Sequence, residues 1–225
     1  MSRAALEGRH VLQESMSRAL EPTVYIVDDD SSVRTALGRL FQSVGVKHEL
    51  FGTAAALLAR AEHGLAGCVL LDLRLQGTNG LELQKELAAA HPDVPVIILS
   101  AVVDVSMTVR AMKAGALEVL TKPFAEQALL DAVNHALETG RVRAREREEL
   151  ERLRTSLDSL TPREREVMAL VVTGMLNKQI ASALGTAETT IKVHRSQVMH
   201  KMGADSIASL VRMADRLGLN STDRN

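Results

Sequence analysis

Residues 23–30 read TVYIVDDD, and this stretch decides the fold of the first half of the chain. A short run of largely apolar residues, with no alternation of polar side chains, is followed by three aspartates and then by the helical pattern SSVRTALGRLFQSVG at 31–45. A strand that is apolar on both faces is typical of a parallel sheet covered by helices on both sides. The three aspartates stand where such a strand ends.

The same alternation of strand and helix patterns continues to about residue 140. Further strand patterns and helical patterns follow one another at 46–51, 53–64, 68–72, 80–91, 94–100, 105–116, 117–121 and from 124 onward. Five strand–helix units in this length predict an α/β fold, a doubly wound five-stranded parallel sheet of the flavodoxin-like kind, because an eight-fold barrel needs about twice the length.

Polar residues stand at the carboxyl ends of the predicted strands, where such folds gather their chemistry. Asp28 and Asp29 follow the first strand, Asp72 ends the third, Ser100 ends the fourth, and Lys122 follows the fifth. Clustered carboxylates repel one another and require a cation, and a site made only of oxygen ligands suits Mg²⁺. A carboxylate neutralised in this way can act as a nucleophile toward a phosphoryl donor.

This set of residues resembles the receiver domain of two-component response regulators. The resemblance implies that Asp72 is the phospho-acceptor, that Ser100 is a switch hydroxyl, and that Lys122, before a cis-bonded proline, contacts the phosphoryl group. It implies a histidine kinase as the phosphoryl donor. It also implies a Mg²⁺ ion held by Asp28, Asp29, Asp72 and the backbone carbonyl of Arg74.

Some positions differ from the family pattern. Gln76 stands where relatives usually have proline, which predicts a more mobile loop, and Val119 stands where an aromatic switch residue is common. Val102 and its neighbour Val103 are bulky and apolar, and we hypothesise that Val102 impedes the hydrolytic water and lengthens the life of the phosphorylated form. Asp30, directly before a helix, is interpreted as its N-terminal cap.

A charged connection follows the predicted sheet. Residues 124–154 read as one long helix, in which Gly140 is a candidate hinge because glycine weakens a helix interior by about 1 kcal/mol. After it, Arg and Glu alternate at helical spacing. Two interpretations stay open for a leucine seam in this connection: it packs onto the next module, or it forms a short dimer contact. The seam comprises Leu150, Leu153, Leu157 and Leu160.

The last part of the chain predicts a small helical bundle. Helical patterns at 162–173, 177–184, 187–202 and 205–217 end at successive glycines. Thr161, Pro162 and Glu164 form the start signal of the first of these helices. A tight turn joins the second and third helices, as in a helix-turn-helix, whose second helix enters the major groove of DNA.

This region resembles the DNA-binding domain of the LuxR/FixJ type, through the stretches LTPREREV, NKQIA, TIKVH and HKM. The resemblance implies that Lys192, Val193 and Ser196 face base edges in double-stranded DNA. It also implies a further set of phosphate contacts, namely Asn177, Lys178, Thr189, Thr190, Arg195 and Lys201. The last helix has an apolar stripe suited to a dimer contact on DNA.

Composition agrees with two modules of different charge. Residues 23–140 hold 9 basic and 14 acidic side chains, a net charge of −5, whereas residues 160–225 hold 9 and 6, a net charge of +3. Aromatic residues make up only 2% of the chain, which argues against a single-strand binder built on stacked rings. The lone Cys68 suits a reducing compartment, and the absence of a long apolar run predicts no membrane span and a cytoplasmic protein.

Together the two halves resemble a full-length two-component response regulator, which implies a phosphorylation-controlled transcriptional regulator that is not an enzyme. The predicted segments are an extension at 1–22, a receiver domain at 23–140, a linker helix at 141–158 and a DNA-binding domain at 159–225. Phosphorylation is expected to shift the packing of the face made by 105–116 and 117–121, which then either forms a homodimer or releases the DNA-binding module. RNA polymerase is a further candidate partner. The alternatives are a regulator that works without phosphorylation and, from another class, a small-molecule phosphatase, which the sequence disfavours because no general acid or substrate cap accompanies Asp72.

Overall fold

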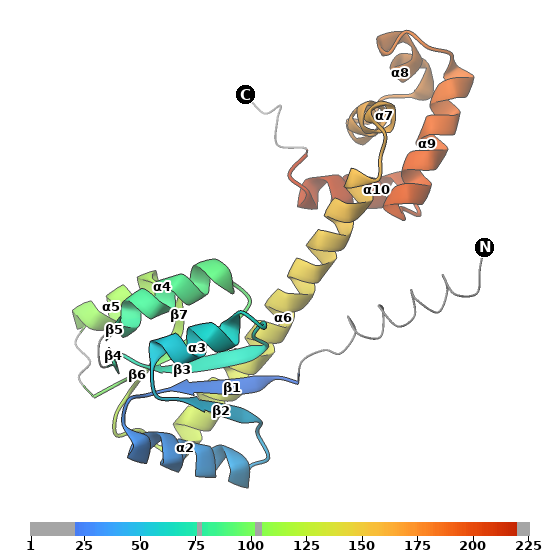
Figure 1. The fold of residues 1–225 in the computed structure, drawn as a ribbon. Coiled ribbons are helices and arrows are strands. Elements are labelled where there is room, and N and C mark those ends of the chain that lie inside the picture. Colours follow the sequence, from blue (N-terminus) through green and yellow to red (C-terminus); the bar gives the residue numbers. More distant parts are fainter. Residues whose placement is uncertain (1–20, 76–77, 102–104, 220–225) are drawn as a thin grey trace. The chain divides into compact units, whose positions relative to one another are not determined.

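The computed structural model of the 225-residue chain describes residues 21–75, 78–101 and 105–219. The chain divides into two compact units, residues 1–144 and 145–225 (Figure 1). The predicted extension lies almost entirely outside the described residues. We describe each unit by itself.

The first unit is built on a parallel sheet in the strand order β2-β1-β3-β6-β7. Its strands are β1 (Thr23–Val27), β2 (His48–Phe51), β3 (Gly67–Asp72), β6 (Val96–Ser100) and β7 (Ala116–Thr121). Every residue of β1 and β6 is buried, as a strand covered on both faces requires. The predicted doubly wound five-stranded fold is therefore confirmed, and its strand order reverses between β1 and β3 (Figure 1).

Helices cover both faces of this sheet. One face packs against α2 (Ser31–Ser43) and the first part of α6 (Glu126–Asp158), around buried Phe41 and Leu129. The other face carries α3 (Ala54–Ala61), α4 (Gly80–Ala90) and α5 (Val105–Lys113). Their buried residues form the second core cluster of the unit, which includes Leu57, Leu87 and Ala111.

The local signals at element ends agree with the sequence, with small shifts of boundary. Asp30 caps α2, its side chain accepting a hydrogen bond from the backbone N–H of Ser32, so its predicted role as a cap is confirmed. The helix predicted over 105–116 is too long. It ends at Lys113 because Gly115 adopts a left-handed conformation with φ of 95°, and the chain turns directly into β7.

The segment after β3 forms a small antiparallel ribbon of β4 (Arg74–Leu75) and β5 (Thr78–Asn79). Asn79 then caps α4 by accepting a hydrogen bond from the backbone N–H of Leu81. The ribbon therefore carries the chain from the end of β3 straight into the next helix. The mobility predicted at Gln76 falls outside the described residues.

Helix α6 runs without a break through Gly140, the predicted hinge. Gly140 is buried, and a Cβ atom there would lie 2.9 Å from the backbone oxygen of Gly67 and 3.0 Å from Pro95. Close packing against the sheet is thus one reason for glycine at this position. The helix also extends beyond the predicted end near residue 154, to Asp158, with Arg154 paired to Glu151 at 2.7 Å.

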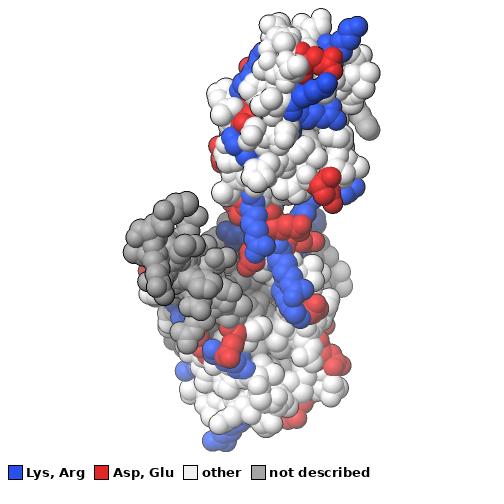
Figure 2. Space-filling model, turned by 90° about the vertical axis from the view of Figure 1, so that its right-hand side faces the viewer, with Lys and Arg blue, Asp and Glu red and all other residues white. Residues whose placement is uncertain are grey.

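The exposed stretch of α6 that follows Gly140 is covered by charges of both signs. Arg141 pairs with Glu138 at 3.7 Å and Arg152 with Glu148 at 3.6 Å, each within one turn of the helix. Basic and acidic side chains alternate visibly along it in Figure 2. Such pairs add only a few tenths of a kcal/mol each, so they support the helix more than they hold any partner.

The second unit is a helical bundle of α7 (Pro162–Val172), α8 (Asn177–Ala183), α9 (Glu188–Met202) and α10 (Ile207–Arg216). Leu160 is buried in its core and Leu157 packs against that core, while Leu153 is 9% exposed. The leucine seam at the end of α6 therefore packs at least in part onto the bundle, one of its two predicted roles. Glu149 of α6 also pairs with Arg216 of α10 at 2.7 Å.

The packing of Gly140 leads to a test of the first unit. Gly140→Ala gains about 1 kcal/mol of helix propensity, but the added methyl group presses on backbone, and overpacking of this kind costs about 1–3 kcal/mol. We expect a net loss of stability, measured by urea unfolding and circular dichroism. Asn134→Ala, at an exposed position of the same helix, is the control and should be neutral or stabilising. A variant at 140 as stable as this control would contradict the packing argument.

Candidate functional site

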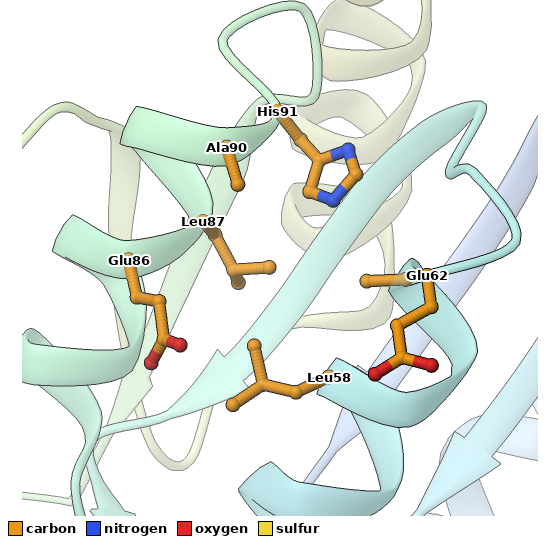
Figure 3. A pocket seen from close by; sticks show the side chains of 7 residues that line it. Leu58, Glu62, Glu86, Leu87, Ala90 and His91 are labelled. Carbon is orange, nitrogen blue, oxygen red and sulfur yellow. The ribbon is translucent and has the colours of Figure 1, made fainter.

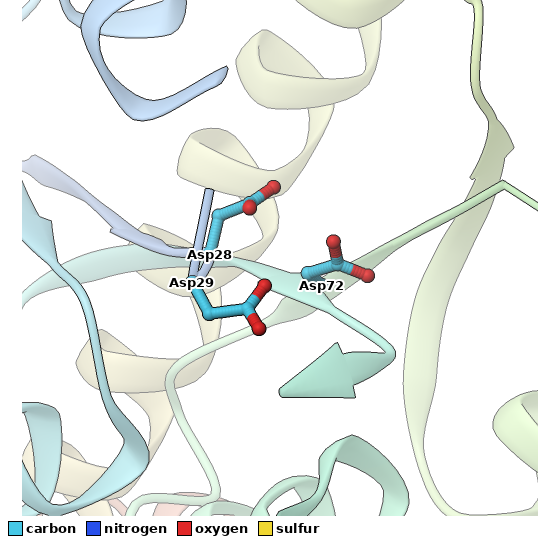
Figure 4. A group of neighbouring side chains, drawn as sticks. All are labelled: Asp28, Asp29 and Asp72. Atoms are coloured by element: carbon cyan, nitrogen blue, oxygen red, sulfur yellow. The ribbon is translucent and has the colours of Figure 1, made fainter. Parts of the chain in front are cut away.

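Three aspartates meet at the carboxyl edge of the sheet, where the strand order reverses. Asp28 and Asp29 follow β1 directly, and Asp72 is the last residue of the neighbouring β3. Each offers a carboxylate oxygen, and these oxygens lie within 4.8 Å of one another (Figure 4). Three negative charges this close are unfavourable unless a cation joins them.

Asp28 is held more firmly than its neighbours. Its side chain is fully buried, one carboxylate oxygen accepts a hydrogen bond from the backbone N–H of Asp30 at 2.9 Å, and the other accepts one from Lys122 at 2.6 Å. Its own backbone N–H donates to the carbonyl of Phe51 at 3.2 Å. Burial raises the pKa of Asp28 and outweighs the opposing effect of Lys122.

Lys122 bridges the carboxylates of two different strands. Its Nζ atom donates to Asp28 at 2.6 Å and to Asp72 at 2.7 Å. Burial by itself would lower the pKa of Lys122, but the hydrogen bonds and charges of the two aspartates together raise it. The ammonium group therefore stays charged and neutralises part of the acidic cluster. The peptide bond between Lys122 and Pro123 is cis, as expected.

The remaining predicted residues lie around this centre. Ser100 is buried at the end of β6, and its backbone carbonyl accepts a hydrogen bond from the N–H of Lys122 at 2.8 Å. The backbone N–H of Arg74 donates to Asp72 at 3.0 Å, while the Arg74 side chain is exposed. Val119, on β7, packs against the core on the α3–α5 face. Val102 and Val103 lie outside the described residues.

The donor set fits a hard divalent cation. Carboxylate oxygens are the ligands that Mg²⁺ prefers, and it is usually bound through one or two carboxylates together with water. Within residues 21–75, 78–101 and 105–219, these aspartates form the one group of three or more acidic, histidine or cysteine side chains near enough to share an ion. The chain thus presents a cluster of carboxylates whose donor atoms suit Mg²⁺.

Sequence reasoning missed one side chain at this edge. Arg34, on the second turn of α2, donates a hydrogen bond from Nη1 to the backbone carbonyl of Asp28 at 2.5 Å. No spacing rule in the sequence points to it, because the contact depends on how α2 packs beside the end of β1.

A concave feature of the unit lies away from these residues. A groove between α3 and α4 is floored by Leu58 and Leu87 and flanked by Glu62, Glu86 and His91 (Figure 3). It lies at the carboxyl ends of these helices, and a helix that follows a parallel strand returns toward the opposite edge of the sheet. The groove therefore does not belong to the aspartate cluster.

In the second unit, α8 and α9 form the predicted helix-turn-helix. Ile191, Val198 and Met202 of α9 are buried, as the sequence indicated. The predicted base-facing residues Lys192, Val193 and Ser196 are exposed, with Val193 60% exposed despite its apolar side chain. Of the predicted phosphate contacts, Lys178, Thr189 and Thr190 are exposed as well.

Three other predicted DNA contacts, Arg195, Asn177 and Lys201, have partners inside the bundle. Arg195 donates to the side chain of Asn177 at 2.8 Å, which joins the start of α8 to α9. Lys201 donates to Glu164 at 2.6 Å and to the carbonyl of Ser159 at 3.3 Å. Lys201 therefore braces the bundle in this structure, and its contact with DNA stays a prediction.

Glu164 is the centre of that brace. It is 5% exposed and completes a capping box with Thr161, in which each side chain bonds the backbone N–H of the other residue. The start signal predicted from Thr161, Pro162 and Glu164 is confirmed, and the pair with Lys201 makes Glu164 a brace as well. Arg163 contributes too, donating to the carbonyl of Leu184 at 2.7 Å.

Comparisons with known proteins cover both units. Residues 24–134 match the response regulator receiver domain, and residues 158–214 match the luxR family of bacterial regulatory proteins. Nodulation protein W of Bradyrhizobium diazoefficiens is 43% identical over 215 residues, which are 96% of this chain and 92% of the relative. Transcriptional regulatory protein FixJ of the same species is 36% identical over 87% of this chain and 96% of its own length.

A solved structure resembles the chain over both units. The response regulator StyR is 45% identical, with a TM-score of 0.77 over 87% of this chain and 98% of that structure. No helix among the described residues is both long and apolar enough to span a membrane.

The Glu164 brace predicts a pH-dependent stability of the second unit. The hydrogen bond from Lys201, followed by that from the backbone of Thr161, lowers the pKa of Glu164 below its usual value near 4.5. Its contribution is therefore complete above pH 4.5 and is lost as the pH falls through the lower native pKa. Glu164→Gln should lower the thermal midpoint at pH 7, and the difference from the wild type should shrink below pH 4.5.

The exposed Glu166 of the same helix provides the control for this experiment. Glu166→Gln should change the midpoint little at any pH, because exposed ion pairs contribute little to stability. A pH-independent difference between the wild type and Glu164→Gln would show that the charge of Glu164 is not what stabilises the unit.

Proposed function

The chain belongs to the response regulators that join a receiver domain to a LuxR-type DNA-binding domain, and on that premise we propose that Asp72 accepts the phosphoryl group that controls it. The family makes the protein a phosphorylation-controlled regulator of transcription. The convergence of Asp28, Asp29, Asp72 and Lys122 at one edge of the sheet is the observation that supports this assignment.

The phosphoryl donor is a histidine kinase. An oxygen of the Asp72 carboxylate attacks phosphorus, a P–O bond forms as the P–N bond to the kinase histidine breaks, and the leaving imidazole takes up a proton. Asp28, Asp29, Asp72 and the carbonyl of Arg74 are the residues that would hold Mg²⁺. When bound, Mg²⁺ supplies positive charge that offsets the repulsion between the carboxylates and the phosphoryl oxygens.

Lys122 and Ser100 respond to the new charge. Lys122 already contacts Asp72 at 2.7 Å, so its ammonium group is placed to follow the negative charge onto the phosphoryl oxygens. Ser100 is joined to Lys122 through the backbone hydrogen bond of 2.8 Å. In the phosphorylated protein the hydroxyl group of Ser100 donates to a phosphoryl oxygen. When Lys122 and Ser100 turn toward the phosphoryl group, they shift the ends of β7 and β6. This shift favours one packing of the neighbouring α5 over another.

The output surface is the face made by α5 and β7. Val105, Val109 and Met112 form an apolar stripe on α5 that is 82%, 44% and 48% exposed, respectively. Two copies that join these stripes bury apolar area that one copy leaves in water. The phosphorylated protein is a homodimer through this face, which brings two DNA-binding domains together and raises their effective concentration on DNA.

DNA is bound through α9. Its exposed residues Lys192, Val193 and Ser196 read base edges in the major groove of double-stranded DNA. Lys178, Thr189 and Thr190 contact phosphates, and Arg195 and Asn177 do so as a hydrogen-bonded pair. Lys201 would have to leave Glu164 before it could contact DNA.

Replacing the proposed acceptor tests this function. We expect acetyl phosphate with Mg²⁺ to raise the affinity of the wild type for its selected duplex by at least about tenfold, within the usual range of allosteric coupling. Asp72→Asn should bind the same duplex with an affinity that acetyl phosphate does not change. Fluorescence anisotropy on a duplex selected by the wild-type protein from a random pool measures both affinities.

Asp131→Asn, at an exposed position of α6, is the matched control and should respond like the wild type. An Asp72→Asn variant that still responds would refute the assignment of the acceptor. If neither protein responds, the regulator works without phosphorylation. Continuous turnover of acetyl phosphate, in place of one adduct per chain, would instead indicate a phosphatase.

The dimer face predicts a second result. Val109→Glu places a carboxylate in the apolar stripe and should weaken phosphorylation-dependent dimerisation by at least about tenfold, or 1.4 kcal/mol. Val142→Glu is the control, because Val142 on α6 is exposed to the same 44% but lies outside the α5–β7 face. Sedimentation with acetyl phosphate measures the dimer fraction, and equal dimerisation of the two variants would exclude α5 as the contact.

A further inference from the structure

Arg34 makes a contact at the acidic cluster that the proposed phosphorylation does not use. It lies on α2, is half-buried, and donates from Nη1 to the backbone carbonyl of Asp28 at 2.5 Å. The guanidinium group of arginine is a planar, rigid fork of donors, which suits it to hold a carbonyl oxygen in one direction.

The contact fixes the backbone carbonyl of Asp28, which takes part in none of the other interactions described for this residue. The backbone N–H of Asp28 bonds Phe51, and its carboxylate bonds Asp30 and Lys122. The carbonyl held by Arg34 belongs to the peptide unit that leads into Asp29. Because a peptide unit is planar, the direction of this carbonyl also sets the position of the N–H and Cα of Asp29.

The side chain of Asp29 is held less firmly than that of Asp28, whose carboxylate is buried and accepts two hydrogen bonds. The carboxylate of Asp29 is half-exposed, yet it lies within 4.8 Å of the carboxylate oxygens of Asp28 and Asp72. The direction of its peptide therefore decides whether this third oxygen is presented to the same point in space as the other two.

Gly52, just after β2, provides a second observation on the same contact. The three atoms nearest to a Cβ built on Gly52 all belong to the Arg34 guanidinium, with Cζ at 3.4 Å. A Cβ there would be in van der Waals contact with the guanidinium, so the further methyl groups of a branched side chain such as valine would press on it. The end of β2 and the end of β1 thus enclose Arg34 from two sides.

We propose that Arg34 is a positioning residue that orients the Asp28–Asp29 peptide and so completes the cation site, an inference that rests on the proposed function of the aspartates. It touches no reacting atom. Its effect is on the affinity of the acidic cluster for a divalent cation, and the effect is present before any phosphoryl donor arrives.

The test measures Mg²⁺ binding by the full-length protein without a phosphoryl donor. Titration with MgCl₂, followed through the backbone amide signals of Asp28 and Asp29 by NMR, gives the dissociation constant. We expect Arg34→Gln to raise this constant by about tenfold, the size of effect that loss of one hydrogen bond from a charged donor produces. Arg34→Lys keeps a charged donor and should restore part of the affinity.

Two further variants separate positioning from general stability. Arg39→Gln, at an exposed site on the same helix, should leave the Mg²⁺ constant unchanged. Gly52→Val keeps Arg34 but displaces it, and should weaken Mg²⁺ binding as Arg34→Gln does. In phosphorylation by acetyl phosphate, Arg34→Gln should need more Mg²⁺ for half the maximal rate and reach the wild-type rate at saturation.

The outcomes are distinct. If the wild type and Arg39→Gln bind Mg²⁺ and both Arg34→Gln and Gly52→Val bind it equally well, Arg34 has no positioning role and the proposed function stands. If the wild type itself binds no Mg²⁺, the cation site of the proposed function fails as well. If Arg34→Gln does not fold, Arg34→Lys and Gly52→Val decide in its place, and unchanged affinity in both overturns the inference.

Discussion

The receiver domain depends on holding three carboxylates within 4.8 Å of one another. Like charges at this distance oppose folding unless a cation compensates them, and Lys122 does so in part by bridging Asp28 and Asp72. The sheet holds the aspartates together against this repulsion, because the backbone pairing of β1 with β3 places the ends of the two strands side by side. A phosphoryl group on Asp72 would add negative charge to a cluster whose repulsion Lys122 offsets only in part.

The same lysine connects the cluster to the rest of the domain. Its backbone N–H bonds the carbonyl of Ser100, so the ends of β6 and β7 meet beside Asp72. β7 then lies next to α5, whose stripe of Val105, Val109 and Met112 faces solvent. A short path of contacts thus runs from the proposed acceptor to the proposed dimer face, and each step of it is a packed strand or helix that can shift as a unit.

The DNA-binding domain is organised around a different charge. The buried Glu164 caps α7 and receives Lys201 from the end of α9, so one carboxylate holds the start of the bundle against the recognition helix. For Lys201, the family resemblance and the structure point to different partners. The resemblance marks it as a DNA contact, whereas the structure gives its ammonium group a partner inside the protein.

Much of this protein follows from sequence alone, because its signals are local. Runs that are apolar on both faces predicted the parallel sheet, and parallel strands bring their carboxyl ends to one edge, which was enough to predict that Asp28, Asp29, Asp72 and Lys122 converge. Asp30 as a cap and the Thr161–Glu164 start signal depend on neighbours only two and three residues apart, respectively. Hydrogen bonds between residues so close in the chain can be predicted from the sequence alone.

Only the tertiary structure decided the contacts between elements far apart in the chain. Gly140 looked like a hinge because glycine weakens a helix, but its close approach to Gly67 and Pro95 depends on how α6 lies on the sheet. Arg34 reaches the carbonyl of Asp28 only because α2 packs beside the end of β1. Periodicity tells which face of a helix is buried. It carries no information on which distant backbone atom that face will meet, since this is set by packing of the whole domain.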